Sequence, residues 1–156
     1  MSDKMIRMSG RGLELLKQYE GFVPRVYRCP AGFRTLGYGH NIDANPLTPY
    51  QQDSWDKDPK ATAEALLRLD LEKFEKVIQK KKPFVRKWDQ PRIDAVIDMT
   101  FNMGAGWMDS WPNTWRHLER KQWSAAANGI RDSRYAKQVG KRAQNNAFTI
   151  ESGEYA

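Results

Sequence analysis

Residues 21–40 are the segment that most restricts the fold of this chain. They read GFVPRVYRCPAGFRTLGYGH, with four glycines, two prolines and β-favouring residues between them. This composition predicts short strands joined by tight turns. The flanking segments instead carry apolar residues at helical spacing. We therefore expect an α+β fold that is mostly helical, with one small antiparallel sheet near the N-terminus.

Helix-start signals place the remaining elements. Ser9 is expected to cap a short helix that ends near Gly21. Asp58 followed by Pro59 predicts the start of the longest helix, which continues to about residue 79. Further helices are expected at about 90–103, 112–119, 122–131 and 134–147, with loops at 41–58 and in the GAGWMDSWP stretch.

The 156-residue chain is expected to form a single domain that needs no cofactor or metal. One cysteine cannot form an intramolecular disulfide, and two histidines without a cysteine cluster do not form a common zinc site. No apolar run approaches the roughly 20 residues of a membrane span, so we expect no membrane insertion. The first residues lack the apolar region of a secretory signal, which favours synthesis in the cytoplasm.

Basic side chains outnumber acidic ones by 26 to 19, which gives a formal net charge of +7. Such a charge favours anionic partners such as nucleic acid, anionic lipid or an acidic cell-wall polymer, or it serves solubility alone. A recognition-helix pattern and an aromatic-basic strand motif are both lacking. A nucleic-acid-binding protein is therefore the least favoured of these classes, and we expect no nucleic-acid partner.

Six tryptophans are a high number for a chain of this size. They could act as stacking platforms for sugars, but for any one of them a place in the core is favoured because large aromatic side chains dominate buried area. Helical spacing predicts a set of core residues in the C-terminal half: Trp115, Leu118, Trp123, Ala127 and Ile130.

Three residues between positions 20 and 35 are candidates for chemistry. Glu20 ends the first predicted helix, where the negative end of the helix dipole opposes ionisation, as a general acid requires. Eight residues separate it from Cys29, and five more separate Cys29 from Thr35. Taken alone, they read as a surface carboxyl, a small apolar residue in a turn and an ordinary strand residue.

The frame E-x8-[D/C]-x5-T, within LLKQYEGFVPRVYRCPAGFRTLGYGH, resembles the catalytic segment of the phage-type lysozymes, glycoside hydrolase family 24. The resemblance continues through LLRLDLEKF, AVIDMTFNMG and ERKQWSAAANGIRDSRYAKQVGKRA, and covers roughly residues 9–148. It implies a lysozyme-like fold of two lobes. The small lobe would span about 21–60, the connecting helix about 59–79, and the helical lobe about 9–20 and 84–156.

The resemblance implies a bacteriolytic muramidase, an endolysin that cleaves the β-1,4 bond between N-acetylmuramic acid and N-acetylglucosamine in peptidoglycan. Such hydrolysis needs an acid for the leaving oxygen and a base or nucleophile across the sugar. Glu20 would be the acid, and Thr35 would position water. Cys29 stands where most members carry Asp, and would act as the base (inverting, which the resemblance favours) or as the nucleophile (retaining).

A free thiol with a pKa near 8.5 is only a few per cent ionised at neutral pH. Arg25, Arg28 and Arg34 lie close in sequence, and their positive charges could lower the pKa of Cys29 if they point inward. A catalytically weak or inert wall-binding module that kept the fold is the alternative to an enzyme.

Other residues match supporting positions of the family. The resemblance implies that His40 and Asp70 form a structural ion pair and that Arg142 pairs with the catalytic carboxyl of Glu20. It further implies that three side chains line the far wall of the cleft: Asn102, Tyr135 and Gln138. The protein would be a monomer that is made in the host cytoplasm and acts on peptidoglycan after release or delivery to the wall.

Overall fold

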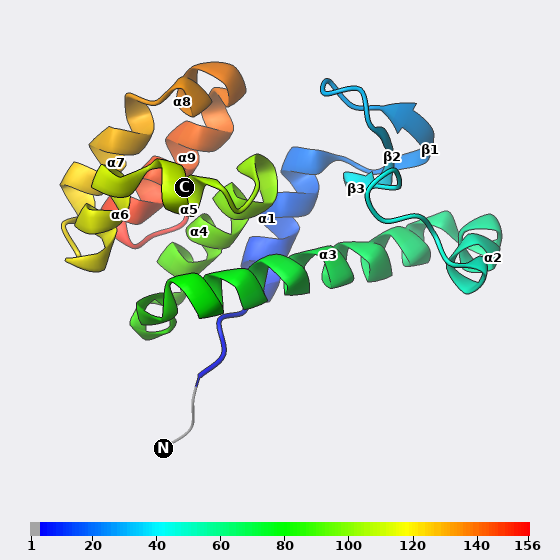
Figure 1. Cartoon of the computed structure of the whole chain (residues 1–156), viewed down its shortest axis with the longest axis horizontal. Helices are drawn as coiled ribbons and strands as arrows, with labels where there is room; N and C mark the ends of the chain where they lie inside the picture. The colour runs from blue at the N-terminus through cyan, green and yellow to red at the C-terminus, as the bar shows by residue number, and fades with distance from the viewer. Residues whose placement is uncertain (1–3) are drawn as a thin grey trace. The chain divides into compact units, whose positions relative to one another are not determined.

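The computed structural model describes residues 4–156 and shows helices together with one three-stranded sheet (Figure 1). The expected α+β, mostly helical class is confirmed. The chain divides into two compact units, residues 14–72 and residues 4–13 with 73–156, and both boundaries fall inside a helix. No helix among residues 4–156 has both the length and the apolar content of a membrane span.

The unit of residues 14–72 holds the sheet. Helix α1 (Gly10–Glu20) begins in the other unit, where the Ser9 hydroxyl accepts a hydrogen bond from the Gly12 amide at 3.0 Å and caps it as predicted. The strands form an antiparallel sheet in chain order, blue to cyan in Figure 1. They are β1 (Val23–Arg28), β2 (Arg34–Gly37) and β3 (His40–Asn41).

Two helices complete this unit, α2 (Pro49–Lys57) and α3 (Pro59–Lys81). The prediction that residues 41–58 are mostly loop was wrong for α2. A capping box starts this helix, because Thr48 and Gln51 exchange side chain–backbone hydrogen bonds and Pro49 fixes the first helical position.

Strand β2 ends in close contact with α3. Gly37 has a φ of +65°, and a Cβ there would lie 2.8 Å from the Cβ of Ala63, so only glycine fits. His40 then places its Nδ1 2.8 Å from Asp70 Oδ2 and its Nε2 2.9 Å from the Asn45 carbonyl oxygen. The pair expected from the resemblance therefore joins the sheet to α3.

The other unit is helical. Helix α9 packs against α4, α7 and α8, and α6 packs against α7. The prediction of one helix over 134–147 was wrong, because Gly140 with a φ of +64° separates two helices. The elements are η1 (Pro83–Lys87), α4 (Gln90–Met103), α5 (Trp107–Ser110), α6 (Pro112–Glu119), α7 (Trp123–Arg131), α8 (Arg134–Val139) and α9 (Lys141–Ser152).

Four of the five predicted core residues are buried: Trp115, Leu118, Ala127 and Ile130. The fifth, Trp123, is only half-buried. Its ring packs edge-on against Trp88, and the Arg92 guanidinium lies 4.2 Å from its ring centre. A cation–π contact therefore covers the part of this indole that the core does not.

Asp94 of α4 ties both ends of the chain to this unit. Its carboxylate is 4% exposed and accepts hydrogen bonds from the Ser9 amide at 2.9 Å, the Ser9 hydroxyl, the Gln90 side chain at 2.9 Å and the Tyr155 hydroxyl at 2.6 Å. Four donors satisfy this buried charge, as burial of a carboxylate requires.

We expect Tyr155→Phe to lower the free energy of unfolding by about 1.5–3 kcal/mol at neutral pH, because a hydrogen bond to a charged group is lost. Burial raises the pKa of Tyr155, and its hydrogen bond to Asp94 raises it further. As pH rises, this phenol therefore ionises in the unfolded chain at a lower pH than in the folded protein. The free energy of unfolding should then decrease as pH rises above about 10. This alkaline loss should be smaller in the variant.

Urea unfolding at neutral and alkaline pH measures both effects. Tyr50→Phe is the matched control, because Tyr50 is 80% exposed, and it should leave both stabilities unchanged. Equal effects of the two substitutions would contradict the role of the Asp94 contact.

Candidate active site

The β1–β2 hairpin brings together two of the three residues expected to carry chemistry. Tyr27 pairs with Thr35 across the strands. Cys29 follows β1 directly, and its amide donates to the Phe33 carbonyl at 3.0 Å, which extends the hairpin by one residue. Cross-strand partners lie on the same face of a sheet, as do residues two apart in a strand. Tyr27, Cys29 and Thr35 therefore share one face of the hairpin.

The turn around Cys29 favours its thiolate. Partial burial alone would raise the pKa of the Cys29 thiol. Hydrogen bonds from the backbone of Phe33, Ala31 and Gly32 and from the Thr35 hydroxyl outweigh burial and lower the pKa below its ordinary value. The Thr35 hydroxyl also donates to the Phe33 carbonyl at 2.9 Å, and it can rotate toward the sulfur when the thiol ionises.

The cause of this lowering differs from the one proposed from sequence. Arg28 donates to the Gly32 carbonyl at 2.8 Å, and Arg34 pairs with Asp43 at 2.7 Å. Turn amides and a hydroxyl, rather than arginine charges, are the groups that lower the pKa of Cys29. Local hydrogen bonds of this kind favour the charged form of a thiol directly.

Glu20 is the last residue of α1 and is half-buried. Its charge reaches the phenol of Tyr27: burial raises the pKa of Tyr27, and the charges of Glu20 and Cys29 raise it further. Tyr27 is thus within electrostatic reach of both groups. Tyr27 was not predicted from sequence, although its position two residues before Cys29 on a strand could have identified it.

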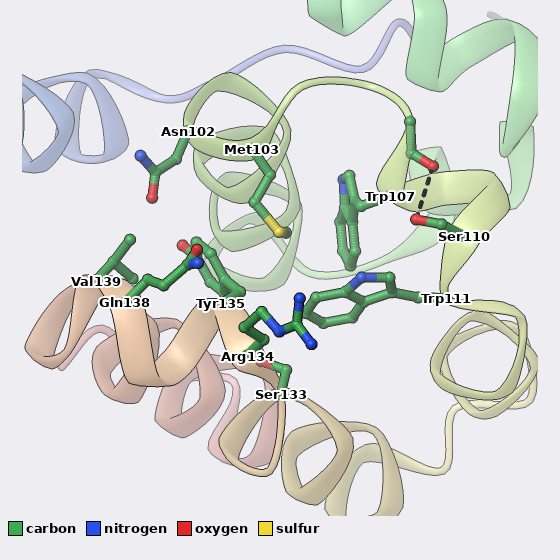
Figure 2. Close-up of a pocket in the computed structure, with 11 residues that line it drawn as sticks. Asn102, Met103, Trp107, Ser110, Trp111, Ser133, Arg134, Tyr135, Gln138 and Val139 are labelled. Carbon is green, nitrogen blue, oxygen red and sulfur yellow. Dashed lines mark hydrogen bonds between the residues drawn. The ribbon is translucent and has the colours of Figure 1, made fainter. Parts of the chain in front are cut away.

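The predicted substrate-binding residues Asn102, Tyr135 and Gln138 line one pocket in the helical unit (Figure 2). The pocket has a volume of about 700 Å³. Its other lining residues were not predicted, because no motif or spacing singled them out: Met103, Gly106, Trp107, Ser110, Trp111, Ser133, Arg134 and Val139. The GAGWMDSWP stretch, expected to be a loop, contains the short helix α5 in this wall.

Arg142 is not among the residues that line this pocket. Its guanidinium makes a two-pronged contact with Asp98, at 2.8 Å and 3.0 Å, and Asn146 donates to the same carboxylate at 2.8 Å. Asp98 is 5% exposed. Such a pair orients the guanidinium rigidly because the planar fork fits both carboxylate oxygens.

We expect the Cys29 thiolate to react with iodoacetamide with a pH midpoint below that of a free thiol, about 8.5. Labelling reports this site alone, because the chain has one cysteine. Thr35→Val removes a hydrogen bond to the sulfur and should move the midpoint to higher pH. Thr35→Ser keeps the hydroxyl and should restore it. The same midpoint in both variants would contradict the contact.

Comparisons with known proteins identify the family of this chain. The family model described as phage lysozyme matches residues 17–146. An endolysin of Acyrthosiphon pisum secondary endosymbiont phage 1 is 35% identical over 101 residues, 64% of this chain and 61% of the endolysin. Probable T4-type lysozymes 1 and 2 of Dictyostelium discoideum are 26% and 23% identical, each over 90% of this chain and 93% of the relative.

The endolysin alignment thus spans about three fifths of that relative's length. The family model, in contrast, covers most of the chain, including Glu20, Cys29 and Thr35. The chain therefore belongs to the phage lysozyme family.

Proposed function

We propose that this protein is a bacteriolytic muramidase that hydrolyses the β-1,4 bond between N-acetylmuramic acid and N-acetylglucosamine in peptidoglycan. One observation carries the proposal. The Cys29 thiol, whose pKa is lowered, interacts with the Thr35 hydroxyl on the face of the hairpin that also carries Tyr27. The charge of Glu20 in turn raises the pKa of Tyr27. An acid and a base at one site are the requirement for glycoside hydrolysis.

In the proposed reaction, the Glu20 carboxyl gives its proton to the glycosidic oxygen as the bond to the anomeric carbon breaks. A water oriented by Thr35 attacks that carbon from the opposite face and loses a proton to the Cys29 thiolate. The anomeric configuration is inverted. The cycle closes when the proton on Cys29 leaves and Glu20 regains one from solvent.

The active form therefore holds a protonated carboxyl and an ionised thiol. Only a minor fraction of the protein molecules holds this combination of protonation states when the pKa of the thiol lies above that of the carboxyl. Hydrogen bonds that lower the pKa of Cys29 increase that fraction at neutral pH, so the turn contributes directly to the rate.

The supporting roles that the family resemblance implies belong to the same proposal. Asn102, Tyr135 and Gln138 would bind the glycan, and Arg142 would support Glu20. The pocket in Figure 2 supports the first assignment, since its walls hold all three side chains. The role of Arg142 toward Glu20 rests on the family resemblance alone, since the partner that the structure gives its guanidinium is Asp98.

Charge is divided unevenly between the two units. Residues 4–13 and 73–156 hold 19 basic and 9 acidic side chains, whereas residues 14–72 hold 7 and 9. The helical unit, with a formal charge of +10, would bring the enzyme to the anionic wall. We propose that the protein acts there as a monomer, after synthesis in the host cytoplasm and release or delivery to the wall.

The second candidate function is a wall-binding module with little or no turnover. Cys29 favours this candidate, since the family resemblance implies Asp at that position in most members and a thiol is the weaker source of a base at neutral pH. Substitution of Glu20 distinguishes the two functions, because hydrolysis requires the general acid whereas wall binding alone does not.

We expect Glu20→Gln and Cys29→Ser to slow the clearing of permeabilised bacteria by roughly 10²-fold or more, as removal of a general acid or base does. Turbidity measures clearing, and NMR of the released anomer identifies inversion. Glu14→Gln is the matched control on the same helix, because Glu14 is exposed and pairs only with Lys17 in the described chain. It should clear like the wild type. Full clearing by Glu20→Gln would end the enzyme assignment.

A further inference from the structure

Phe33 is an aromatic residue beside the candidate catalytic thiol, at the tip of the β1–β2 hairpin (Figure 1). The Cys29 amide donates to the Phe33 carbonyl at 3.0 Å, two residues beyond the pairing of Tyr27 with Thr35. This register makes Phe33 the cross-strand neighbour of Cys29. Phe33 also lies two residues before Thr35, so its side chain belongs to the face that carries the thiol and the hydroxyl.

The Phe33 ring is accessible on that face. Phe33 is 49% exposed, and within residues 4–156 its ring makes no aromatic or cation–π contact. Val26 is equally exposed, at 51%, but it precedes Tyr27 by one residue and therefore lies on the opposite face. Position beside the thiol, rather than exposure, thus distinguishes Phe33.

A phenylalanine ring extends farther from a sheet than a thiol does. Cross-strand neighbours have Cβ atoms about 4.5–5.5 Å apart, so the Phe33 ring stands directly beside the sulfur of Cys29. The sulfur is one bond beyond its Cβ, whereas the phenyl ring continues well past that height. A sugar that approaches this face therefore meets the aromatic ring first, and its flat C–H face fits an aromatic plane.

We propose that Phe33 is the spacer of this site: the sugar stacks on its ring, and the gap left above Cys29 admits a water molecule and prevents direct attack by sulfur. The proposal rests on the proposed function. It adds the residue that decides between the two roles open to Cys29, base and nucleophile. Inverting glycosidases hold their two carboxyl groups about 6.5–9.5 Å apart to leave room for water, whereas retaining ones hold them about 5–5.5 Å apart.

The Thr35 hydroxyl supplies a place for that water. It donates to the Phe33 carbonyl at 2.9 Å, and it also hydrogen-bonds with the Cys29 sulfur. A hydroxyl oxygen has two acceptor lone pairs, which its donated hydrogen bond leaves available. A water bound there would lie near the thiolate and below a sugar that rests on the Phe33 ring.

Removal of the spacer should change the reaction rather than only slow it. In Phe33→Ala, the sugar can reach the thiolate. The sulfur forms a bond to the anomeric carbon, the bond from that carbon to the glycosidic oxygen breaks, and Glu20 gives its proton to this oxygen. Water then attacks the same carbon, gives a proton to the Glu20 carboxylate and releases the thiolate. Two displacements retain the anomeric configuration.

The test compares the full-length wild type with three variants on purified peptidoglycan. NMR identifies the anomer that is released first, and intact mass spectrometry detects glycan bound to the single cysteine. The wild type should release the inverted anomer without an adduct. Phe33→Ala should raise KM at least about tenfold, as loss of an aromatic anchor does, and should give the retained anomer or an adduct on Cys29.

Phe33→Tyr keeps the ring and should behave like the wild type. Val26→Ala is the matched control on the opposite face and should also leave KM and the anomer unchanged. A second readout needs no turnover: Phe33→Ala should speed labelling of Cys29 by a bulky maleimide more than labelling by iodoacetamide. Circular dichroism checks that each variant folds.

The inverted anomer from Phe33→Ala would overturn the proposal, whatever its KM, as would a retained anomer from the wild type. Equal changes in labelling by the two reagents would also overturn it. These results are separate from the proposed function. Clearing with inversion by every variant removes the spacer alone. Absence of clearing by the wild type removes the enzyme, and the labelling rates then still test the spacing.

Discussion

The contact between the Cys29 thiol and the Thr35 hydroxyl is the interaction on which the account of this protein depends. It exists because the β1–β2 hairpin pairs Tyr27 with Thr35 and turns tightly after Cys29. A slip of one residue in that register would move Thr35 to the opposite face. The same turn directs backbone amides at the sulfur, so the element that positions the thiol also favours its ionised form.

The two units contribute different physical properties. Residues 14–72 hold the candidate catalytic groups and carry slightly more acidic than basic charge. Residues 4–13 and 73–156 hold the aromatic pocket and the basic excess. The unit with the basic excess is the one that would attract a polyanion, and the other unit holds the residues proposed for acid–base chemistry.

Much of the fold could be predicted from sequence, because caps and breaks are local. Ser9, Pro59 and Asp89 start helices where expected. The missed helix α2 depends on a capping box, which outweighs the polar, proline-containing composition of its segment. The break at Gly140 was missed because glycine inside a helical pattern only sometimes adopts a positive φ.

The candidate site was predictable to the extent that strand spacing fixes it. The strand pairing places Thr35 beside the turn that holds Cys29, but the source of the lowered pKa depends on where turn amides point, which sequence does not reveal. The position of Tyr27 on the same face follows from the alternation of side chains along β1. The pocket lined by Asn102, Tyr135 and Gln138 is built from helices that are distant in the chain, so its other walls could not be identified from composition or spacing.

The pH dependence of kcat/KM for wall hydrolysis, compared between the wild type and Cys29→Asp, tests the central claim most directly. An acid–base pair gives a bell-shaped profile whose limbs report the titration of the two groups. If Cys29 is the base, the alkaline limb of the wild type reports the thiol. A carboxyl at this position, which titrates near 3.9, should then move that limb to lower pH by several units. Coincident alkaline limbs in the two proteins would show that the thiol takes no part in the reaction.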